Sequence, residues 1–420
     1  MSVDNSELLM LLGGKKSKSP IGKAGQKGFG VGVYGGDPAD LTAMGLAPME
    51  GCEDPTSDNY GNYIHTNGSV MVFIPAFAIR IGNASAPLYS KYGADTIEIG
   101  DVGLNGKDGW AIPRGFYDGG NLHQGFFIDK YLNSKDATKK QAISVKNGDP
   151  IALSASYNKS SELPNCIGRI HDAIELSRAR GEHYSLVSCY QWAVISLITQ
   201  AHAQASAGTE ACAWYDASGQ KNYPKGNNNR GRDVDDNTIT FTTAESGSFV
   251  HVRKTGSAVP LAKTTHNGQV SGICDVNGNM GQPVLGWQNP SNQKFKLAKL
   301  SVKMHDFTKD NIYNATLFDE ISIDTGDGTY YWQRGKSLYS DTSGSGWAMN
   351  GVMPKTLTGT SGDAMYGKDY ADLNFDTNRV LLVAGYYASV AGAGSWYRNG
   401  KNNWDSDDYV ASFRAAAYPP

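Results

Sequence analysis

Residues 167–205 read IGRIHDAIELSRARGEHYSLVSCYQWAVISLITQAHAQA, and this stretch decides the fold class. Its first half predicts a helix, because apolar or small residues recur every three or four positions. Gly181 follows as a helix stop, and Arg178 and Arg180 stand near the negative helix end, where cations are favoured. The side chains expected to face the core are Ile167, Ile170, Ala173, Ile174 and Ser177.

The second half of the stretch predicts a longer helix after Ser188. A serine hydroxyl can accept a hydrogen bond from a free backbone N–H of the first turn, so we expect Ser188 to be the N-cap. The buried stripe of this helix is expected at Trp192, Ile195, Leu197, Ile198 and Ala201.

Short strands and long loops are predicted on both sides of the two helices. Upstream, a long apolar run is interrupted by Pro75, which predicts two short strands in place of one. Two consecutive helices embedded in many short strands predict an α+β fold. The expected strands lie within residues 69–82, 96–101, 124–134, 238–243, 248–254, 329–334 and 379–387.

Composition divides the chain into three parts. Residues 1–30 end in GGKKSKSPIGKAGQKGFG, a run rich in Gly, Lys and Ser that cannot bury a face, so we expect a flexible or helical attachment arm. Residues 31–118 are expected to form a β-rich N-terminal region. Residues 119–420 contain both helices and are expected to form the C-terminal domain.

Charge, hydropathy and cysteine usage argue against several classes of partner. The chain has 38 Lys and Arg against 41 Asp and Glu, so no basic excess indicates nucleic acid. No apolar run approaches the roughly 18 residues of a membrane span, so no membrane insertion is expected. The cysteines are odd in number, widely spaced and without a CxxC pair, which predicts free thiols. They are Cys52, Cys166, Cys189, Cys212 and Cys274.

Catalytic motifs are absent from the sequence, which predicts that the protein is not an enzyme. GxSxG, HExxH and the P-loop pattern do not occur. A GxGxxG begins at Gly30, but no helix follows it to bind a phosphate, so we interpret it as a glycine-rich turn. His171 is expected to be a structural helix residue, and nothing near Cys212 or His202 indicates a lowered thiol pKa.

Two aspartate-rich loops leave calcium open, with no other cofactor expected. Carboxylate oxygens are the ligands that Ca²⁺ prefers. The alternative is that these side chains cap turns by accepting hydrogen bonds from their own backbone. The candidate metal ligands are Asp233, Asp235 and Asp236, with a second acidic loop at Asp405, Asp407 and Asp408.

The last part of the chain has the composition of a contact surface. Residues 385–413, GYYASVAGAGSWYRNGKNNWDSDDYVASF, combine Tyr and Trp with Asn, Ser, Asp and Gly. Antibody paratopes and interface hot spots favour these residue types, because Tyr and Trp give rigid contact area and small polar residues adapt their hydrogen bonds. The alternative is packing inside the domain, which we expect for Trp396. The candidate ligand-binding residues are Tyr386, Tyr387, Ser389, Tyr397, Asn399, Asn402, Asn403, Trp404, Asp405, Asp407 and Tyr409.

Five motifs in order extend this interpretation to residues 119–420. They are FFIDKYLNS (126–134), DAIELSRARGEHYSLVSCYQWAVI (172–195), NYPKGNNNRG (222–231), THNGQVSGICDVNGNMGQPVLGW (265–287) and SFRAAA (412–417). Together they resemble the C-type-lectin-like fold of the formylglycine-generating (sulfatase-modifying) type. The GxxDxxGN part of that family's signature is matched by Gly272, Asp275, Gly278 and Asn279.

Departures from that family weaken its oxidase activity as an interpretation. The family holds copper with two cysteines near its C-terminus, and this chain has none after Cys274. Gln282 and Pro283 stand where the signature has Glu and Trp, and Ser412 replaces the glycine before Phe-Arg. An oxidase of this type remains a disfavoured alternative.

Residues 384–415 also resemble the C-terminal segment of the variable proteins of diversity-generating retroelements and related phage tail-fibre tips. The expected GGxW opening is replaced here by residues 384–387, AGYY. Residues 61–82, GNYIHTNGSVMVFIPAFAIRIG, are similar to a segment common in phage tail-fibre proteins.

These two resemblances imply a bacteriophage tail-fibre or tail-tip receptor-binding protein, made in the host cytoplasm and assembled into the virion. They imply a homotrimer whose partners are a host cell-surface glycan or protein and other tail subunits. The alternative is a structural virion protein, in the tail or as decoration, without a receptor role.

Overall fold

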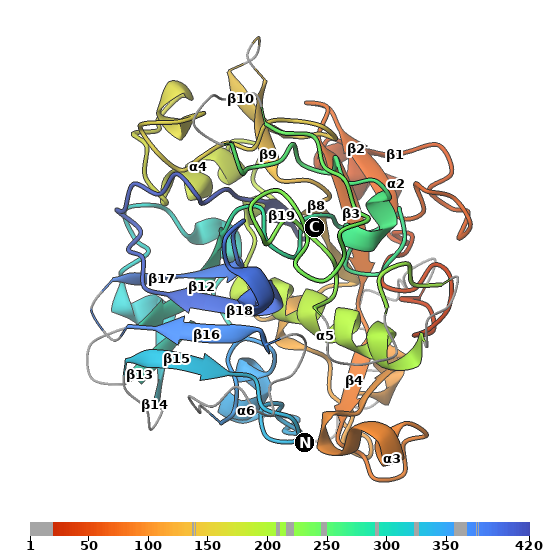
Figure 1. The fold of residues 1–420 in the computed structure, drawn as a ribbon. Coiled ribbons are helices and arrows are strands. Elements are labelled where there is room, and N and C mark those ends of the chain that lie inside the picture. The colour runs from red at the N-terminus through yellow and green to blue at the C-terminus, as the bar shows by residue number, and fades with distance from the viewer. Residues whose placement is uncertain are drawn as a thin grey trace.

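The computed structural model describes residues 20–136, 138, 140–206, 211–215, 222–244, 250–289, 294–322, 327–356, 368–374, 376 and 378–420. Within these residues the fold has few helices and many strands gathered in sheets, as Figure 1 shows. The predicted α+β class is therefore confirmed. No helix of the described part is long and apolar enough to cross a membrane.

A six-stranded antiparallel sheet joins the beginning, the middle and the end of the chain. Its strand order is β1-β2-β3-β8-β19-β11. Its central strands β3, β8 and β19 are almost wholly buried, and Phe73 pairs with Phe127 across the first two of them. The strands are β1 (Leu46–Pro48), β2 (Asn62–His65), β3 (Val70–Pro75), β8 (Gly125–Asp129), β11 (Tyr184–Leu186) and β19 (Ala415–Ala417).

The predicted division after residue 118 does not separate two cores. β3 comes from the N-terminal region and β8 from the C-terminal domain, yet they are neighbours in the sheet. One hydrophobic cluster extends from Ile21 to Tyr418. The two regions therefore share both a sheet and a core.

A seven-stranded sheet forms the second layer. Its order is β14-β13-β12-β17-β18-β16-β15, and all neighbours are antiparallel except the parallel pair β16 and β18. β12, β17 and β18 lie at its centre and are nearly wholly buried. The strands are β12 (Gln282–Asn289), β13 (Lys294–Ala298), β14 (Phe318–Ser322), β15 (Gly328–Tyr331), β16 (Tyr370–Leu373), β17 (Arg379–Ala384) and β18 (Gly394–Gly400).

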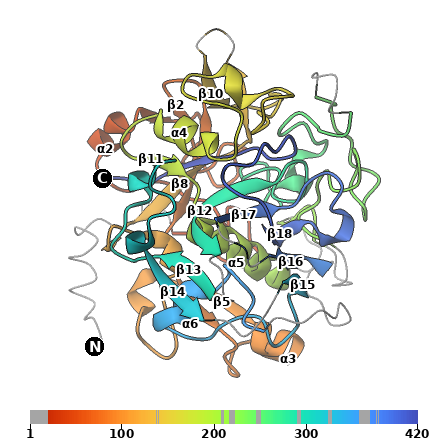
Figure 2. The same ribbon diagram turned by 90° about the vertical axis from the view of Figure 1, so that its left-hand side faces the viewer.

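The helix α5 (Cys189–Ala205) runs through the centre of the molecule in both views (Figures 1 and 2). Ser188 is its N-cap, as predicted: its hydroxyl accepts from Gln191 N at 3.1 Å, and Gln191 Oε1 accepts from Ser188 N at 2.9 Å. The helix is buried on all sides, not only along the predicted stripe, because it packs on β12 and β18 and also on β5.

The helix α4 (Asp172–Arg178) is shorter than predicted. The Asp172 carboxylate accepts hydrogen bonds from the backbone N–H groups of Ile167, Gly168 and Arg169, which holds the chain before the helix in a turn. Ile167 is 60% exposed, so its predicted place in the buried stripe is wrong.

Some of the strand predictions are confirmed and others are wrong. β3 ends at Pro75 and a separate β4 follows, so the predicted interruption is confirmed. The strands predicted within 238–243 and 248–254 are absent from the described residues, where only the isolated bridges Thr240–Val259 and Thr243–Arg253 occur. The Thr242 amide donates to the Ser257 hydroxyl at 3.1 Å in place of a ladder carbonyl.

The smaller elements complete the described chain. The remaining strands pair as β4 (Ala78–Ile81) with β5 (Ile97–Gly100), β6 (Tyr117–Asp118) with β7 (Asn121–Leu122), and β9 (Asn133–Asp136) with β10 (Gln141–Ser144). The short α-helices are α2 (Pro38–Ala43), α3 (Tyr89–Tyr92) and α6 (Gly344–Met349), and the 3-10 turns are η1 (Gly93–Asp95), η2 (Val102–Leu104), η3 (Arg114–Phe116), η4 (Ser160–Glu162), η5 (Leu261–Thr264), η6 (Met304–Asp306), η7 (Ala315–Leu317) and η9 (Val390–Gly392).

The described part of the predicted arm, residues 20–30, packs on the core. Phe29 is fully buried, and its ring stacks on His202 with centroids 5.0 Å apart. Gly25 N donates to His202 Nδ1 at 3.1 Å. Gly30 O accepts a hydrogen bond from His266 Nε2 at 3.0 Å, and a Cβ at Gly30 would lie 3.0 Å from that nitrogen. The attachment-arm prediction therefore fails for residues 20–30, and residues 1–19 lie outside the described residues.

Candidate binding surface

Tyrosine side chains form a row at the edge where β15, β16 and β18 lie side by side. Tyr331 and Tyr370 have ring centroids 6.0 Å apart, and Tyr370 and Tyr397 are 5.2 Å apart, both in edge-to-face geometry. Burial, followed by the nearby Asp372, raises the pKa of Tyr370.

The row continues through the loop after β17 to solvent-exposed rings. Tyr386 and Tyr387 are in edge-to-face contact at 5.4 Å, and both are partly exposed. Burial, followed by the nearby hydroxyls of Tyr409 and Tyr386, raises the pKa of Tyr387. Tyr409 is 48% exposed and lies 6.0 Å from the ring of Tyr157, which is 39% exposed. We call Tyr157, Tyr386, Tyr387 and Tyr409 the tyrosine surface.

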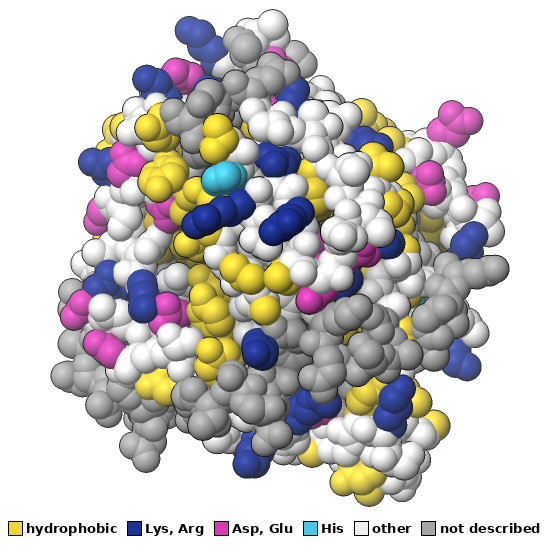
Figure 3. Space-filling view, in the orientation of Figure 1, with side chains coloured by type: hydrophobic (Ala, Val, Ile, Leu, Met, Phe, Trp, Pro, Cys, Tyr) yellow, Lys and Arg dark blue, Asp and Glu magenta, His cyan; other side chains and the backbone are white. Residues whose placement is uncertain are grey.

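A histidine and an arginine border the tyrosine surface. Figure 3 shows that hydrophobic, basic and acidic side chains are interspersed on the face of the molecule seen in Figure 1. The ring of His251 lies 5.4 Å from that of Tyr387. The exposed Arg230 donates its backbone N–H to Tyr387 O at 2.6 Å.

Tyr387 is anchored at its base by a small apolar cluster. The cluster consists of Leu132, Ala152, Ala244, Val252 and Met280. The ring is packed on this cluster and remains partly exposed. Such a ring loses little conformational entropy when a ligand binds.

Asn279, from the GxxDxxGN motif, joins the three loops behind the tyrosine surface. Its Oδ1 accepts from Asn227 Nδ2 and Arg253 N, both at 2.9 Å, and its Nδ2 donates to Arg253 O at 2.9 Å. Its backbone O accepts from Tyr387 N at 3.2 Å. Its φ of 65° is one that asparagine tolerates better than most residues. The motif therefore has a structural role, which is to position Tyr387.

The carboxylates of the first calcium candidate make hydrogen bonds and an ion pair within the protein. Asp233 is 2% exposed and accepts from the backbone N–H groups of Gly226 (2.7 Å), Asp235 (2.8 Å) and Asp236 (3.1 Å). Burial raises its pKa to about 6. Asp236 binds Lys263 Nζ at 2.6 Å. The turn-capping alternative therefore describes Asp233 and Asp236 better than calcium does, since Asp236 also accepts from Thr238 N at 3.0 Å. Asp235 accepts from Asn222 N at 2.9 Å and so joins two segments.

The second acidic loop is hydrogen-bonded to segments that are distant in sequence. Asp405 accepts from Tyr313 OH at 3.1 Å, and Asp407 accepts from Ala155 N at 3.2 Å. Asp408 is 9% exposed and accepts from Val410 N at 2.9 Å. Among the described residues no group of three or more His, Cys, Asp or Glu could hold a metal ion.

The predicted ligand residues fall into three groups. Tyr386, Tyr387, Asp405, Asp407 and Tyr409 are partly or fully exposed around the tyrosine surface. The half-buried residues Asn399, Asn402 and Asn403 lie beyond Gly394 along the chain, at and after the far end of β18.

The third group is buried, and here the prediction is corrected. Tyr397 is 3% exposed and Trp404 is 1% exposed. Tyr397 belongs to β18, an inner strand of the seven-stranded sheet, so its ring packs in the row described above. Ser389 is 9% exposed, and its hydroxyl accepts from Tyr386 N at 3.1 Å. Of the three, Ser389 supports the tyrosine surface from behind through this bond to Tyr386. Trp396 is buried, as expected.

Sequence patterns did not indicate Tyr157, His251 or Tyr370. Each stands in a separate segment outside residues 384–409, and none is part of a motif. Only the pairing of segments brings them to the surface, for example the bridge Leu153–Asp408 that places Tyr157 near Tyr409.

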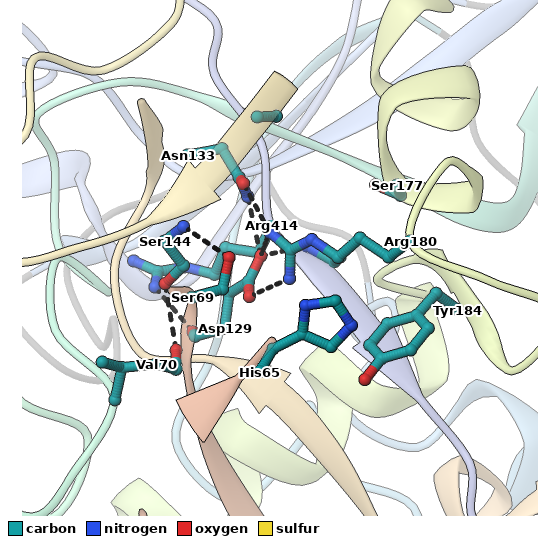
Figure 4. A network of polar contacts seen from close by, with 12 residues as sticks. His65, Ser69, Val70, Asp129, Asn133, Ser144, Ser177, Arg180, Tyr184 and Arg414 are labelled. Carbon is teal, nitrogen blue, oxygen red and sulfur yellow. Dashed lines mark hydrogen bonds and ion pairs between the residues drawn. The ribbon is translucent and has the colours of Figure 1, made fainter. Parts of the chain in front are cut away.

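A buried ion pair ties the ends of the C-terminal domain together (Figure 4). Asp129, at the end of β8, accepts from Arg180 Nη1 at 2.5 Å and Nη2 at 3.0 Å, and from Asn133 Nδ2 at 2.7 Å. The fully buried Arg414 donates to Asp129 O at 2.9 Å and to Gln282 Oε1 at 2.8 Å. The motifs that are separate in sequence thus meet in one polar network.

Four cysteine thiols have a raised pKa, whereas an activated nucleophile has a lowered one. Burial raises the pKa of Cys166, Cys189, Cys212 and Cys274 to about 12 each. A thiol of this kind is protonated and weakly reactive at neutral pH. His202, near Cys212, is buried and its pKa is lowered to about 4 by that burial.

Comparison with solved structures gives a distant likeness. No family model matches the chain, and no curated protein matches it. A solved structure named "Major Tropism Determinant U1 Variant" is similar at a TM-score of 0.31 and 11% sequence identity. The alignment covers 83% of this chain and 63% of that chain, so this chain spans less than two thirds of its neighbour's length.

Proposed function

We propose that this chain is a bacteriophage tail-fibre or tail-tip receptor-binding protein that recognises a host-surface ligand through its tyrosine surface. The observation that carries the proposal is the exposure of Tyr157, Tyr386, Tyr387 and Tyr409 on loops that are held from behind. Large amphipathic rings on a rigid support are the residues from which protein interfaces gain most of their binding energy.

The framework lowers the cost of binding. Asn279 fixes the loop of Tyr387, and the Leu153–Asp408 bridge joins the loops of Tyr157 and Tyr409. Because these loops are already ordered, little conformational entropy is lost on contact. Asp405 and Asp407 at the rim and Arg230 beside Tyr387 would give the contact its orientation.

The assignment to a phage particle rests on the motif resemblances of residues 61–82 and 384–415. The C-type-lectin-like fold, virion location and homotrimeric assembly belong to the same proposal. Binding without turnover is the proposed mechanism. In a trimeric fibre, weak single contacts would be multiplied by multivalency.

Alanine replacement of three rings tests the proposal. Tyr386→Ala, Tyr387→Ala and Tyr409→Ala combined in one chain should reduce binding of the purified protein to host cells at least about tenfold, because rings of this kind each contribute more than about 1 kcal/mol at an interface. The matched control is Tyr89→Ala, which removes a partly exposed tyrosine from α3.

Three outcomes separate the alternatives. Lost adsorption with an unchanged melting temperature supports the receptor role, provided that the Tyr89→Ala protein binds normally. Undiminished adsorption by the triple variant would contradict it. A failure of the unaltered chain to bind any host cell would favour the structural virion protein.

A further inference from the structure

A polar groove lies on another part of the molecule. It has a volume of about 780 Å³ and is bounded by the end of α4, the β9–β10 hairpin and the turn that follows β2. This volume is within the roughly 300–1,000 Å³ range of small-molecule sites. Its lining shares no residue with the tyrosine surface.

The floor of the groove is a fixed polar network. Figure 4 shows the imidazole of His65 facing the guanidinium of Arg180, with Tyr184 beside it. Arg180 is held by Asp129 and Asn133, and its side chain is 3% exposed. Its buried Nε has no hydrogen-bond partner among the described residues. His65 Nδ1 accepts from Asn67 N at 3.1 Å, so its Nε2 carries the proton and is a donor.

The walls of the groove mix hydrogen-bond donors with acceptors. Lys140 and Arg178 supply cationic donors, and Glu175 and Glu182 supply anionic acceptors. The side-chain amides of Gln141 and Asn165 each provide both kinds of group. The formal charges of the two cations and two glutamates cancel, and the charge of Arg180 is matched by Asp129.

This lining selects a class of ligand. A hydroxyl group donates one hydrogen bond and accepts others, so neighbouring donors and acceptors fit it on both sides. A strongly anionic ligand would meet the two glutamates, and a strongly cationic one would meet Lys140 and Arg178. An apolar ligand would bury these charged groups without partners.

We propose that this groove binds a neutral, polyhydroxylated ligand of the saccharide class. The buried Arg180–Asp129 pair and His65 form its base, and the α4 end with the β10 residues Gln141 and Ala142 forms its sides. The site is separate from the tyrosine surface and stands whether or not that surface binds a host ligand.

Calorimetric titration of the full chain tests the groove, with maltotriose, cellotriose and triacetylchitotriose as neutral probes and citrate as the anionic probe. We expect at least one neutral trisaccharide to bind at millimolar concentration. Ala179→Trp adds a bulky ring at an exposed groove position and should weaken that binding at least about tenfold.

Two further variants provide a second test of the groove and a control for the tyrosine surface. Glu182→Gln removes one charge from an exposed side chain, so the fold is not affected, and it should weaken binding several-fold. The triple tyrosine variant should bind the trisaccharide as the unaltered chain does. Absence of binding by all three neutral probes, preference for citrate, or unchanged binding by Ala179→Trp would each overturn the proposal.

Discussion

At the scale of single residues, the surface depends on polar side chains that are buried. Asn279 makes three side-chain hydrogen bonds behind Tyr387 and has a positive φ. Gln282, which replaces the expected glutamate, accepts from Arg414 Nε and donates from Nε2 to Asp275 O at 3.1 Å. An amide can do both, whereas a carboxylate only accepts, so this departure from the family motif has a structural explanation.

Asn279→Ala should lower the free energy of unfolding by about 3 kcal/mol, because it removes one hydrogen bond from the Asn227 side chain and two from the backbone N–H and C=O of Arg253. Urea denaturation measures this change. The matched control is Asn378→Ala, at an exposed residue with a similar φ of 66°, which should cost only the backbone strain of about 1 kcal/mol. Equal losses in the two variants would show that backbone conformation alone explains Asn279.

At the scale of elements, the segment of residues 21–33 is docked on α5 through a neutral histidine. His202 is fully buried, accepts from Gly25 N at Nδ1 and stacks on Phe29. Its Nε2 donates to Ala211 O at 3.0 Å. Burial lowers its pKa to about 4, because protonation would require an unsolvated charge and would break the bond from Gly25.

The contribution of His202 to stability should therefore be lost in acid. The folded-state pKa of about 4 lies below the unfolded value of about 6.5, so the contribution is complete above pH 6.5 and disappears as the pH falls towards 4. We expect the difference in unfolding free energy between the unaltered chain and His202→Gln to narrow by about 3 kcal/mol from pH 7 to pH 4. The buried carboxyl groups titrate in both proteins, so their contributions to the pH dependence cancel when the difference is taken. A constant difference across that range would contradict a neutral buried His202.

Sequence patterns predicted elements better where local chemistry decides them. The Ser188 cap and the interruption at Pro75 are local, and both were predicted correctly. The start of α4 was predicted too early, because the Asp172 side chain competes for the backbone groups that would continue the helix. The strands expected near Thr240 were not formed, since their partners are loops that no local pattern identifies.

At the scale of the whole molecule, the composition of residues 384–415 indicated a contact surface but did not show which of its side chains are exposed. Residues 384–415 include the buried inner strand β18, so aromatic composition alone could not separate Tyr387 from Tyr397 or Trp404. The tyrosine surface also needs Tyr157, which only the tertiary fold brings to Tyr409. Deleting the whole segment would remove a core strand, so point variants are the appropriate test.

The central claim is that the tyrosine surface contacts a host ligand, and a hydrogen–deuterium exchange footprint on the full chain tests it most directly. Exchange would be compared with and without envelope fragments of a host that the protein adsorbs to. The account predicts slower exchange in residues 384–392 and 404–410, and in the segment around Tyr157, on addition of the fragments. Protection confined to other segments, or binding with no protection in these loops, would contradict it.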